Sequence, residues 1–400
     1  MRDELIDIFA AGLRRADPGP AVTEALSEAA APSVIVALGK ASVAMARAAY
    51  ERFPGTPGLV VTNAENASDP PEARVLVVVG EHPVPGPGSA AAGEAALAQV
   101  ADLGVEDRVL ALISGGASAL AVAPVEGVTL ADKAAVSRLL LASGLDITAM
   151  NLVRQNLSRL KGGGLARAAA PATVETLILS DVVGDDLSVI ASGPTVPPAG
   201  GPGAARALLE AEGLWDKVPA SCRAVLARRG PDATPQGPVR LVGSNRLSAE
   251  AMLAVAPGAV LEDAPLTGDV AAAAERIAAV ARHGAAGTTL WGGETTVRLR
   301  GQGRGGRNQE LALRVALALR DLARPWAFLS GGTDGRDGPT DAAGGLVDDG
   351  TLGRIAAAGL DAEALLAEND SYPVLAASGD LLMTGGTGTN VADLQILRVG

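Results

Sequence analysis

Short apolar runs alternate with amphipathic segments along the first half of the chain. The apolar runs predict strands at 33–38, 58–62, 74–79, 108–113 and 175–179. Helical periodicity predicts helices at 2–16, 22–30, 42–53, 89–103, 130–144, 147–160 and 164–169. Strands that alternate with helices form βαβ units, so we expect a parallel sheet whose turns gather at the carboxyl ends of the strands.

A second series of strands and helices begins near residue 239, after two stretches rich in proline and glycine at 197–203 and 230–238. Its predicted strands are 239–242, 288–291, 295–300, 326–329 and 394–399, and its predicted helices are 245–255, 269–283 and 311–319. Because 400 residues exceed the usual size of one hydrophobic core, we predict two α/β domains, 1–236 and 237–400.

Composition narrows the class of protein. The net charge of -12 argues against a nucleic-acid or acidic-membrane surface, although an anionic substrate stays possible because the local sign of charge decides that. Cys222 is the single cysteine, and His82 and His283 are the two histidines, so neither a disulfide framework nor a histidine-rich metal site is expected. We find no signal peptide and no run of eighteen apolar residues, so we expect a cytoplasmic enzyme or binding protein.

The stretch from Trp291 to Glu310 combines the end of a strand, a glycine run and the start of a helix at Asn308. The run carries Arg304 and Arg307 among Gly301, Gly303, Gly305 and Gly306. Backbone N–H groups, the helix dipole and guanidinium groups would converge there, which favours a bound phosphate over a flexible basic hairpin. The run also matches G-x-G-x-x-G, but the preceding strand alternates and no acid follows at the tip of a second strand, which argues against a dinucleotide site.

Several turns in the first half carry polar residues that could bind an anion. Lys40 follows a strand and opens a helix, which suits a cation aimed at a phosphate, but Val34 stands where a P-loop needs glycine. The turn from Ser114 to Ser118 could hold a carboxylate or phosphate, or be only a tight turn. His82 could contact substrate or satisfy a backbone carbonyl, and Lys161 could bind an anion or only stabilise a helix terminus.

Aspartates follow two of the predicted strands, as Asp181, Asp185 and Asp186 and as Asp334, Asp337 and Asp341. Carboxylates at the carboxyl ends of strands suit magnesium or a general base. Aspartate is also a common turn residue, so each one alone has an ordinary structural explanation. The later cluster is not a calcium loop, because Gly345 stands where such a loop needs glutamate.

A series of strings in this order resembles the glycerate 2-kinase family, which has an N-terminal Rossmann-like domain and a C-terminal MOFRL domain. The strings are GKAS at 39, HPVP at 82, SGGASAL at 114, NLVRQNLSRLKGGGLA at 151, SDVVGDDLSVIASGPT at 180, GGETTVRLRGQGRGGRNQE at 292, SGGTDGRDGPTDAAGG at 330, NDSY at 369 and TGTNV at 387. The resemblance covers nearly the whole chain. One departure is Gly386, where we expect proline.

The resemblance implies ATP-dependent phosphorylation of D-glycerate at its 2-hydroxyl, with magnesium or another divalent cation, in a cleft between the domains. The family's functional lysine and arginine fall on Lys40 and Arg307, and we expect Asp181 and Asp334 to be catalytic with them. The expected glycerate-binding residues are His82, Ser114, Gly115, Gly116 and Ser118. The expected nucleotide-binding residues are Lys161, Gly293, Glu294, Gly305, Gly306, Asn308, Gly331 and Gly332, and Asp186 is the expected metal ligand.

We expect no partner beyond glycerate and ATP, no nucleic acid and no membrane, and a monomer or homodimer. Two other functions stay open. One is an NAD(P)H-dependent hydroxypyruvate reductase, a name also given to this family, with the glycines at 301–306 holding the nicotinamide nucleotide. The other is a non-catalytic protein that binds sugar acids in the same cleft.

Overall fold

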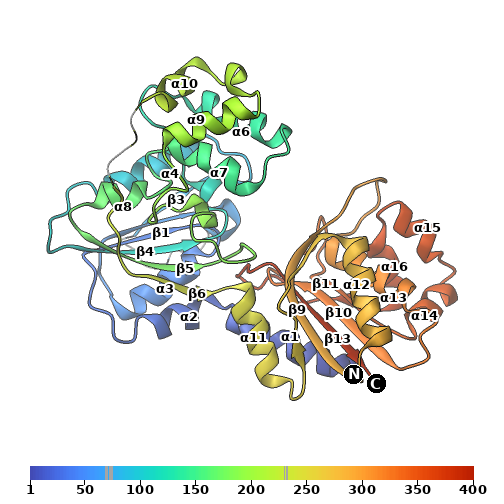
Figure 1. The fold of residues 1–400 in the computed structure, drawn as a ribbon. Helices are drawn as coiled ribbons and strands as arrows, with labels where there is room; N and C mark the ends of the chain where they lie inside the picture. The colour runs from blue at the N-terminus through green and yellow to red at the C-terminus, as the bar shows by residue number, and fades with distance from the viewer. Residues whose placement is uncertain (68–70, 72–74, 229, 231–232) are drawn as a thin grey trace. The chain divides into compact units, whose positions relative to one another are not determined.

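The computed structural model of the chain describes residues 1–67, 71, 75–228, 230 and 233–400 (Figure 1). They form two compact units. The parallel-sheet unit is Pro18–Val242, and the mixed-sheet unit is Met1–Asp17 together with Gly243–Gly400. The predicted two-domain α/β class is confirmed, but the chain divides differently from the predicted 1–236 and 237–400, because the N-terminal helix packs with the second half.

The parallel-sheet unit contains six strands in the order β3-β2-β1-β4-β5-β6. Their bounds are β1 (Val34–Leu38), β2 (Gly58–Thr62), β3 (Leu76–Val79), β4 (Arg108–Ser114), β5 (Thr173–Leu179) and β6 (Val239–Gly243). The first five pair in parallel. Every residue of β1 and β2 is buried, as expected for parallel strands covered on both faces. The predicted strand 74–79 begins at Arg74, which lies outside the described residues, and β3 starts at Leu76.

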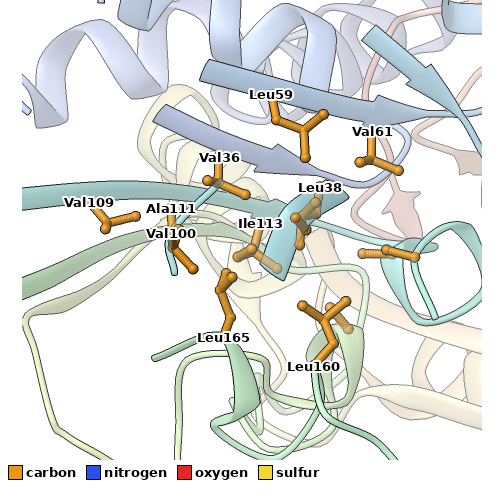
Figure 2. Close-up of a cluster of buried hydrophobic side chains, with 14 of the residues drawn as sticks. Val36, Leu38, Leu59, Val61, Val100, Val109, Ala111, Ile113, Leu160 and Leu165 are labelled. Atoms are coloured by element: carbon orange, nitrogen blue, oxygen red, sulfur yellow. The ribbon is translucent and has the colours of Figure 1, made fainter. Parts of the chain in front are cut away.

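Helices cover both faces of this sheet, with α2 and α3 on one side and α4 and α8 on the other (Figure 1). Figure 2 shows the core on the second face, where Leu160 and Leu165 pack near Leu38 and Ile113. A second apolar cluster joins α6, α7, α9 and α10. The helix bounds are α2 (Pro18–Ala25), α3 (Ser42–Arg52), α4 (Pro87–Ala98), α5 (Ala117–Leu120), α6 (Leu130–Ala142), α7 (Ile147–Asn156), α8 (Gly164–Ala169), α9 (Pro202–Ala211) and α10 (Ala220–Leu226).

The mixed-sheet unit has strand order β12-β11-β10-β13-β9-β7, and β8 pairs with β9. The bounds are β7 (Val260–Leu261), β8 (Leu266–Asp269), β9 (Gly287–Thr296), β10 (Trp326–Gly332), β11 (Gly344–Asp348), β12 (Leu381–Leu382) and β13 (Asp393–Val399). The alternating segment 297–300 was predicted as strand but is not one. Segment 297–300 has no strand beside it to pair with, because the pairing with β13 stops at Gly293 and the pairing with β8 stops at Thr296.

Two helical layers cover the mixed sheet. On one face α12 and α13 pack on residues such as Trp291 and Phe328. On the other face α1 packs on Leu329 and Ile396 through Leu5 and Phe9, which places the N-terminal helix in this unit. Helix α11 joins the same cluster through Met252. The helix bounds are α1 (Arg2–Arg15), α11 (Asn245–Val255), α12 (Val270–His283), α13 (Arg307–Ala318), α14 (Thr351–Ala357), α15 (Ala362–Ala367) and α16 (Ser371–Ser378).

Candidate functional site

The turns after β1 and β4 lie side by side at the carboxyl edge of the parallel sheet, because the two strands are neighbours in parallel register. The N–H of Lys40 donates to the carbonyl of Gly115 over 2.9 Å, and the N–H of Ala41 donates to Ser114 Oγ over 3.1 Å. Gly39 has φ 127° and approaches Ser114 so closely that a Cβ there would overlap it. The hydroxyl of Ser114 therefore holds the two turns together.

Three predicted side chains reach the glycine pair after β4. A Cβ placed on Gly116 would lie 3.1 Å from Lys40 Cγ and 3.4 Å from His82 Cδ2. A Cβ on Gly115 would overlap the carboxylate of Asp181, which follows β5. The fold therefore brings a lysine, a histidine and an aspartate together around two glycines, and the Asp181 carboxylate fills the place that a side chain on Gly115 would take.

The electrostatics of this edge suit proton transfer. Burial raises the pKa of Asp181, and the nearby charge of Lys40 only partly opposes this. Burial also lowers the pKa of His82, and Lys40 lowers it further. His82 is therefore a neutral hydrogen-bonding group near pH 7, and Asp181 takes up a proton more readily than an exposed aspartate does.

Three further predicted residues of this unit make local contacts. Ser118 Oγ lies 2.8 Å from Ser192 Oγ, and the Ser118 carbonyl accepts a hydrogen bond from Lys161 Nζ over 2.6 Å. One carboxylate oxygen of Asp186 accepts from the backbone N–H and the hydroxyl of Ser188, at 2.9 and 2.7 Å. Asp186 thus closes its own turn, which is the ordinary structural role of aspartate there.

Arg307 is the first residue of α13, and a buried carboxylate holds its side chain. Its Nε and NH2 groups donate to the two carboxylate oxygens of Asp393 over 2.6 and 2.9 Å, and NH2 lies 3.2 Å from Glu294 Oε1. The Asp393 side chain is fully buried, whereas that of Arg307 is 33% exposed. Burial alone would lower the pKa of Arg307, but the hydrogen bonds to Asp393 outweigh it and raise the pKa. Arg307 is therefore a fixed and permanent cation.

Strand register explains the predicted glycines beside Arg307. Asp393 opens β13 and pairs with Gly293 of β9 on one side and with Gly332 of β10 on the other. A Cβ on Gly332 would lie 3.3 Å from Asp334 Oδ1 and 3.5 Å from Asp393 Oδ1, so both carboxylates reach that glycine. The neighbouring Gly331 faces the opposite side, where a Cβ would contact Phe9 in the apolar core. The prediction that Gly331 contacts a nucleotide therefore finds no support in its surroundings.

The start of α13 is not the open anion site that the sequence suggested. The N–H groups of Asn308 and Gln309 donate to the two carboxylate oxygens of Asp337 over 3.1 and 2.8 Å. Asp337 is buried, and Gly306 has no side chain because a Cβ there would overlap it. The free N–H groups expected around Asn308 and Gly306 are thus already occupied by a protein carboxylate.

The glycine run before α13 packs against the segment 368–371. The N–H groups of Arg300 and Gly301 donate to Asn369 Oδ1 over 2.7 and 3.1 Å, and the N–H of Gly303 donates to the carbonyl of Glu368 over 2.9 Å. Gly305 is close enough to Ser371 that a Cβ would overlap its hydroxyl. The expectation that these glycines leave the backbone open to a phosphate is corrected: they let two loops of the same unit approach each other.

The sequence analysis did not identify Asp393, and it did not predict that Asp337 accepts hydrogen bonds from the start of α13. Asp393 begins a buried strand, DLQILRV, and a charged residue at a fully buried strand position needs a partner of opposite charge. That argument predicts a cation beside it but does not identify Arg307. Asp337 was one of six turn aspartates, and nothing local separates it from the others.

Neither unit contains a dedicated metal site in the part of the chain that the structure describes. No group of three or more His, Cys, Asp or Glu side chains there is arranged to hold a metal ion. Magnesium needs no such cage, because it is commonly held by one or two carboxylates together with substrate phosphates. Among the described helices, none has the length and apolar character needed to cross a membrane.

Comparisons with known proteins cover almost the whole chain. Residues 4–227 match the model of a domain of unknown function, DUF4147, and residues 287–393 match the MOFRL family. A "Putative hydroxypyruvate reductase" of Agrobacterium vitis is 43% identical, covering 100% of this chain and 94% of that protein. A D-glycerate 2-kinase of Thermotoga maritima is 37% identical, covering 98% of this chain and 96% of that protein. The crystal structure of a glycerate kinase from Thermotoga maritima superposes with a TM-score of 0.93 at 36% identity, covering 100% of this chain and 99% of that one.

Proposed function

Because the chain belongs to the glycerate 2-kinase family, we propose that it transfers the γ-phosphoryl group of ATP to the 2-hydroxyl of D-glycerate. The products are 2-phosphoglycerate and ADP. The observation that carries this proposal is the convergence of Lys40, His82 and Asp181 on the Gly115–Gly116 turn. A cation, a neutral donor and a partly buried carboxylate at one turn suit phosphoryl transfer to an alcohol.

The roles follow from the chemistry of each group. Lys40 offsets negative charge that develops on the transferring phosphoryl group. Arg307, in the mixed-sheet unit, keeps the role of functional cation that the family implies. Asp181 accepts the proton of the glycerate hydroxyl, which its raised pKa favours. His82 is neutral near pH 7 and donates a hydrogen bond to substrate oxygen.

Carboxylates at strand ends could hold magnesium together with the nucleotide phosphates. Asp181 and Asp334 each follow a strand end. Asp334 accepts the N–H of Arg336 over 3.0 Å through Oδ1, so its second carboxylate oxygen is the one available to a metal, and Asp186 uses one oxygen for both of its contacts with Ser188. Magnesium, when bound, neutralises charge on the nucleotide phosphates. Gly293 and Gly332 flank Asp393, the partner of Arg307, in strand register, and Glu294 adds an exposed carboxylate next to Arg307.

The reductase alternative loses its structural argument. It required the glycines at 301–306 to hold a nicotinamide nucleotide, and their neighbours are instead Glu368, Ser371 and Asp337. The non-catalytic alternative, a cytoplasmic location and the choice between monomer and homodimer stay predictions.

The test is a pair of assays on one preparation of the purified protein. ATP, magnesium and D-glycerate should yield ADP at a rate that depends on glycerate. NADH or NADPH with hydroxypyruvate should not be oxidised. Oxidation of the nicotinamide nucleotide without any ADP release would overturn the proposal, and glycerate binding without either reaction would favour the non-catalytic protein.

A further inference from the structure

Three basic side chains gather near the Ser114–Ser118 turn of the parallel-sheet unit. Lys133 comes from α6, Arg154 from α7 and Lys161 from the loop before α8. The two lysines are each only 5% exposed, and Arg154 is partly buried. The helices α6 and α7 pack against each other, and Arg154 is close enough to act electrostatically on both lysines.

This cation cluster has no carboxylate partner within the described part of the chain. Lys161 Nζ donates to the carbonyl of Ser118 over 2.6 Å, and Lys133 Nζ donates to the carbonyl of Leu157 over 3.4 Å. The side chain of Arg154 makes no hydrogen bond or ion pair with any described residue. Carbonyl oxygens satisfy donors but carry no full charge, so the cluster lacks the counter-charge that buried cations need.

The groups that face the cluster from neighbouring elements do not supply that charge. From α10 the facing titratable group is the thiol of Cys222, and burial raises its pKa, so it is neutral near pH 7. On α6, the Asp132 carboxylate accepts from Thr129 at the helix start. Asp186, after β5, closes its own turn with Ser188. On α9, the exposed Arg206 and Glu210 pair with each other.

Polar side chains connect the cluster to the turn after β4. Asn151 lies three residues before Arg154 on α7 and is 3% exposed. Its Oδ1 accepts from Ser192 Oγ over 3.2 Å, and Ser192 Oγ lies 2.8 Å from Ser118 Oγ. Ala191 and Ser192 have φ values of 53° and 59°, a left-handed conformation that is costly for residues with a Cβ. The network therefore holds a strained segment beside the cations.

We propose that Lys133, Arg154 and Lys161 form a subsite for one oxyanion group, a carboxylate or a phosphate, next to the Ser114–Ser118 turn. The inference rests on the proposed function, because glycerate and the phosphates of ATP are the reactants that carry such groups. The anion supplies the missing counter-charge. Lys161 then couples it to the turn that positions the substrate, through the carbonyl of Ser118.

Proton uptake is the distinctive consequence of such a subsite. Burial lowers the pKa of Lys133 to about 7, with Arg154 as the next cause, and burial also lowers the pKa of Lys161 well below its usual range. A bound oxyanion reverses this effect, because it favours the charged form of each lysine. Binding should therefore take up protons from solution above pH 7, and affinity should fall as the pH rises.

Calorimetry of the whole protein tests this with three probes: D-glycerate, a non-hydrolysable ATP analogue and inorganic phosphate. Each is titrated at pH 8 in two buffers that differ in ionisation enthalpy, so that the difference in heat reports protons taken up. The probe that occupies the subsite should take up at least about half a proton per molecule bound. Uptake with glycerate but not the analogue identifies a carboxylate, and the reverse identifies a phosphate.

Arg154→Gln should weaken that probe at least about tenfold, the loss expected for one charge-assisted contact. Arg138→Gln is the matched control, because Arg138 is an exposed arginine on α6, and it should leave affinity unchanged. Absence of proton uptake with all three probes overturns the subsite, as does equal binding by Arg154→Gln and the unmodified protein. If Arg154→Gln fails to fold, the calorimetry of the unmodified protein is the test: proton uptake with one of the probes supports the subsite, and its absence with all three overturns it.

Turnover separates this inference from the function on which it rests. ADP formation with glycerate, together with no proton uptake with any probe, refutes the proposed subsite and supports the proposed kinase function. Proton-coupled phosphate binding without ADP formation keeps the subsite and removes the kinase.

Discussion

Replacing Asp393 with asparagine tests whether a buried carboxylate is what makes Arg307 a fixed cation. The two side chains share hydrogen bonds of 2.6 and 2.9 Å, and the change keeps the shape of the carboxylate while removing its charge. The amide also turns one oxygen into an NH2 group, which cannot accept from the guanidinium. Arg307 therefore loses its bidentate partner without a cavity being created.

The loss in free energy of unfolding caused by Asp393→Asn follows from the burial of Asp393 and Arg307. Removing one member of a buried ion pair costs about 3–5 kcal/mol. Because the Arg307 side chain is 33% exposed and Glu294 stays 3.2 Å away, we expect a smaller loss, about 2–3 kcal/mol. That loss lowers the unfolding midpoint of a unit of this size by roughly 4–12 °C. A guanidinium free to leave its position should also reduce kcat about 100-fold.

The assay combines steady-state kinetics with thermal unfolding. Arg246→Gln is the control, since Arg246 and Glu250 form an exposed pair one helical turn apart on α11, and its loss should cost about 0.5 kcal/mol or less. The double variant of Asp393→Asn with Arg307→Ala should be little worse in kcat than Arg307→Ala alone, because both changes remove the same unit. Losses in kcat that add in the double variant, or a kcat of Asp393→Asn within twofold of the unmodified enzyme, would refute this reasoning.

Three further outcomes are expected. Lys40→Met should lower kcat about 100-fold or more with an unchanged unfolding midpoint, and near-normal ADP formation would remove its assigned role. Gly115→Ala should lower kcat/KM at least about tenfold, because the new Cβ would overlap the Asp181 carboxylate; a normal rate would show that this carboxylate does not matter. Burial raises the pKa of Asp337 to about 6, so its proton-linked stabilisation is complete below about pH 4 and is lost as the pH rises through 6. The unfolding midpoint should therefore fall between about pH 4 and 6 more steeply than in Asp337→Asn, and parallel curves would contradict the shift.

The parallel-sheet edge could be predicted because its evidence is local. Each buried apolar strand ends in a polar turn, and the rule that parallel strands present their carboxyl ends together places Lys40, Ser114 and Asp181 at one edge. What the rule cannot give is which side chains meet. The approach of His82 and Lys40 to Gly116 depends on the paths of separate turns.

The surroundings of Arg307 could not be predicted, because they depend on antiparallel register between segments far apart in the chain. Arg307 and Asp393 are separated by 86 positions, and their contact requires β13 to lie between β9 and β10 in one register. The glycine run was assigned to a ligand for the same reason: its partner, the segment around Asn369, is 68 positions from Gly301. Similarly, the apolar face of α1 predicts burial but does not say against which sheet.

The most direct measurement is a phosphorus NMR spectrum of the purified protein with ATP, magnesium and D-glycerate, recorded until the reaction stops. We expect one new phosphomonoester resonance, that of 2-phosphoglycerate, growing in proportion to ADP. A resonance of 3-phosphoglycerate, or unchanged ATP in a preparation that oxidises NADH with hydroxypyruvate, would contradict phosphoryl transfer to the 2-hydroxyl.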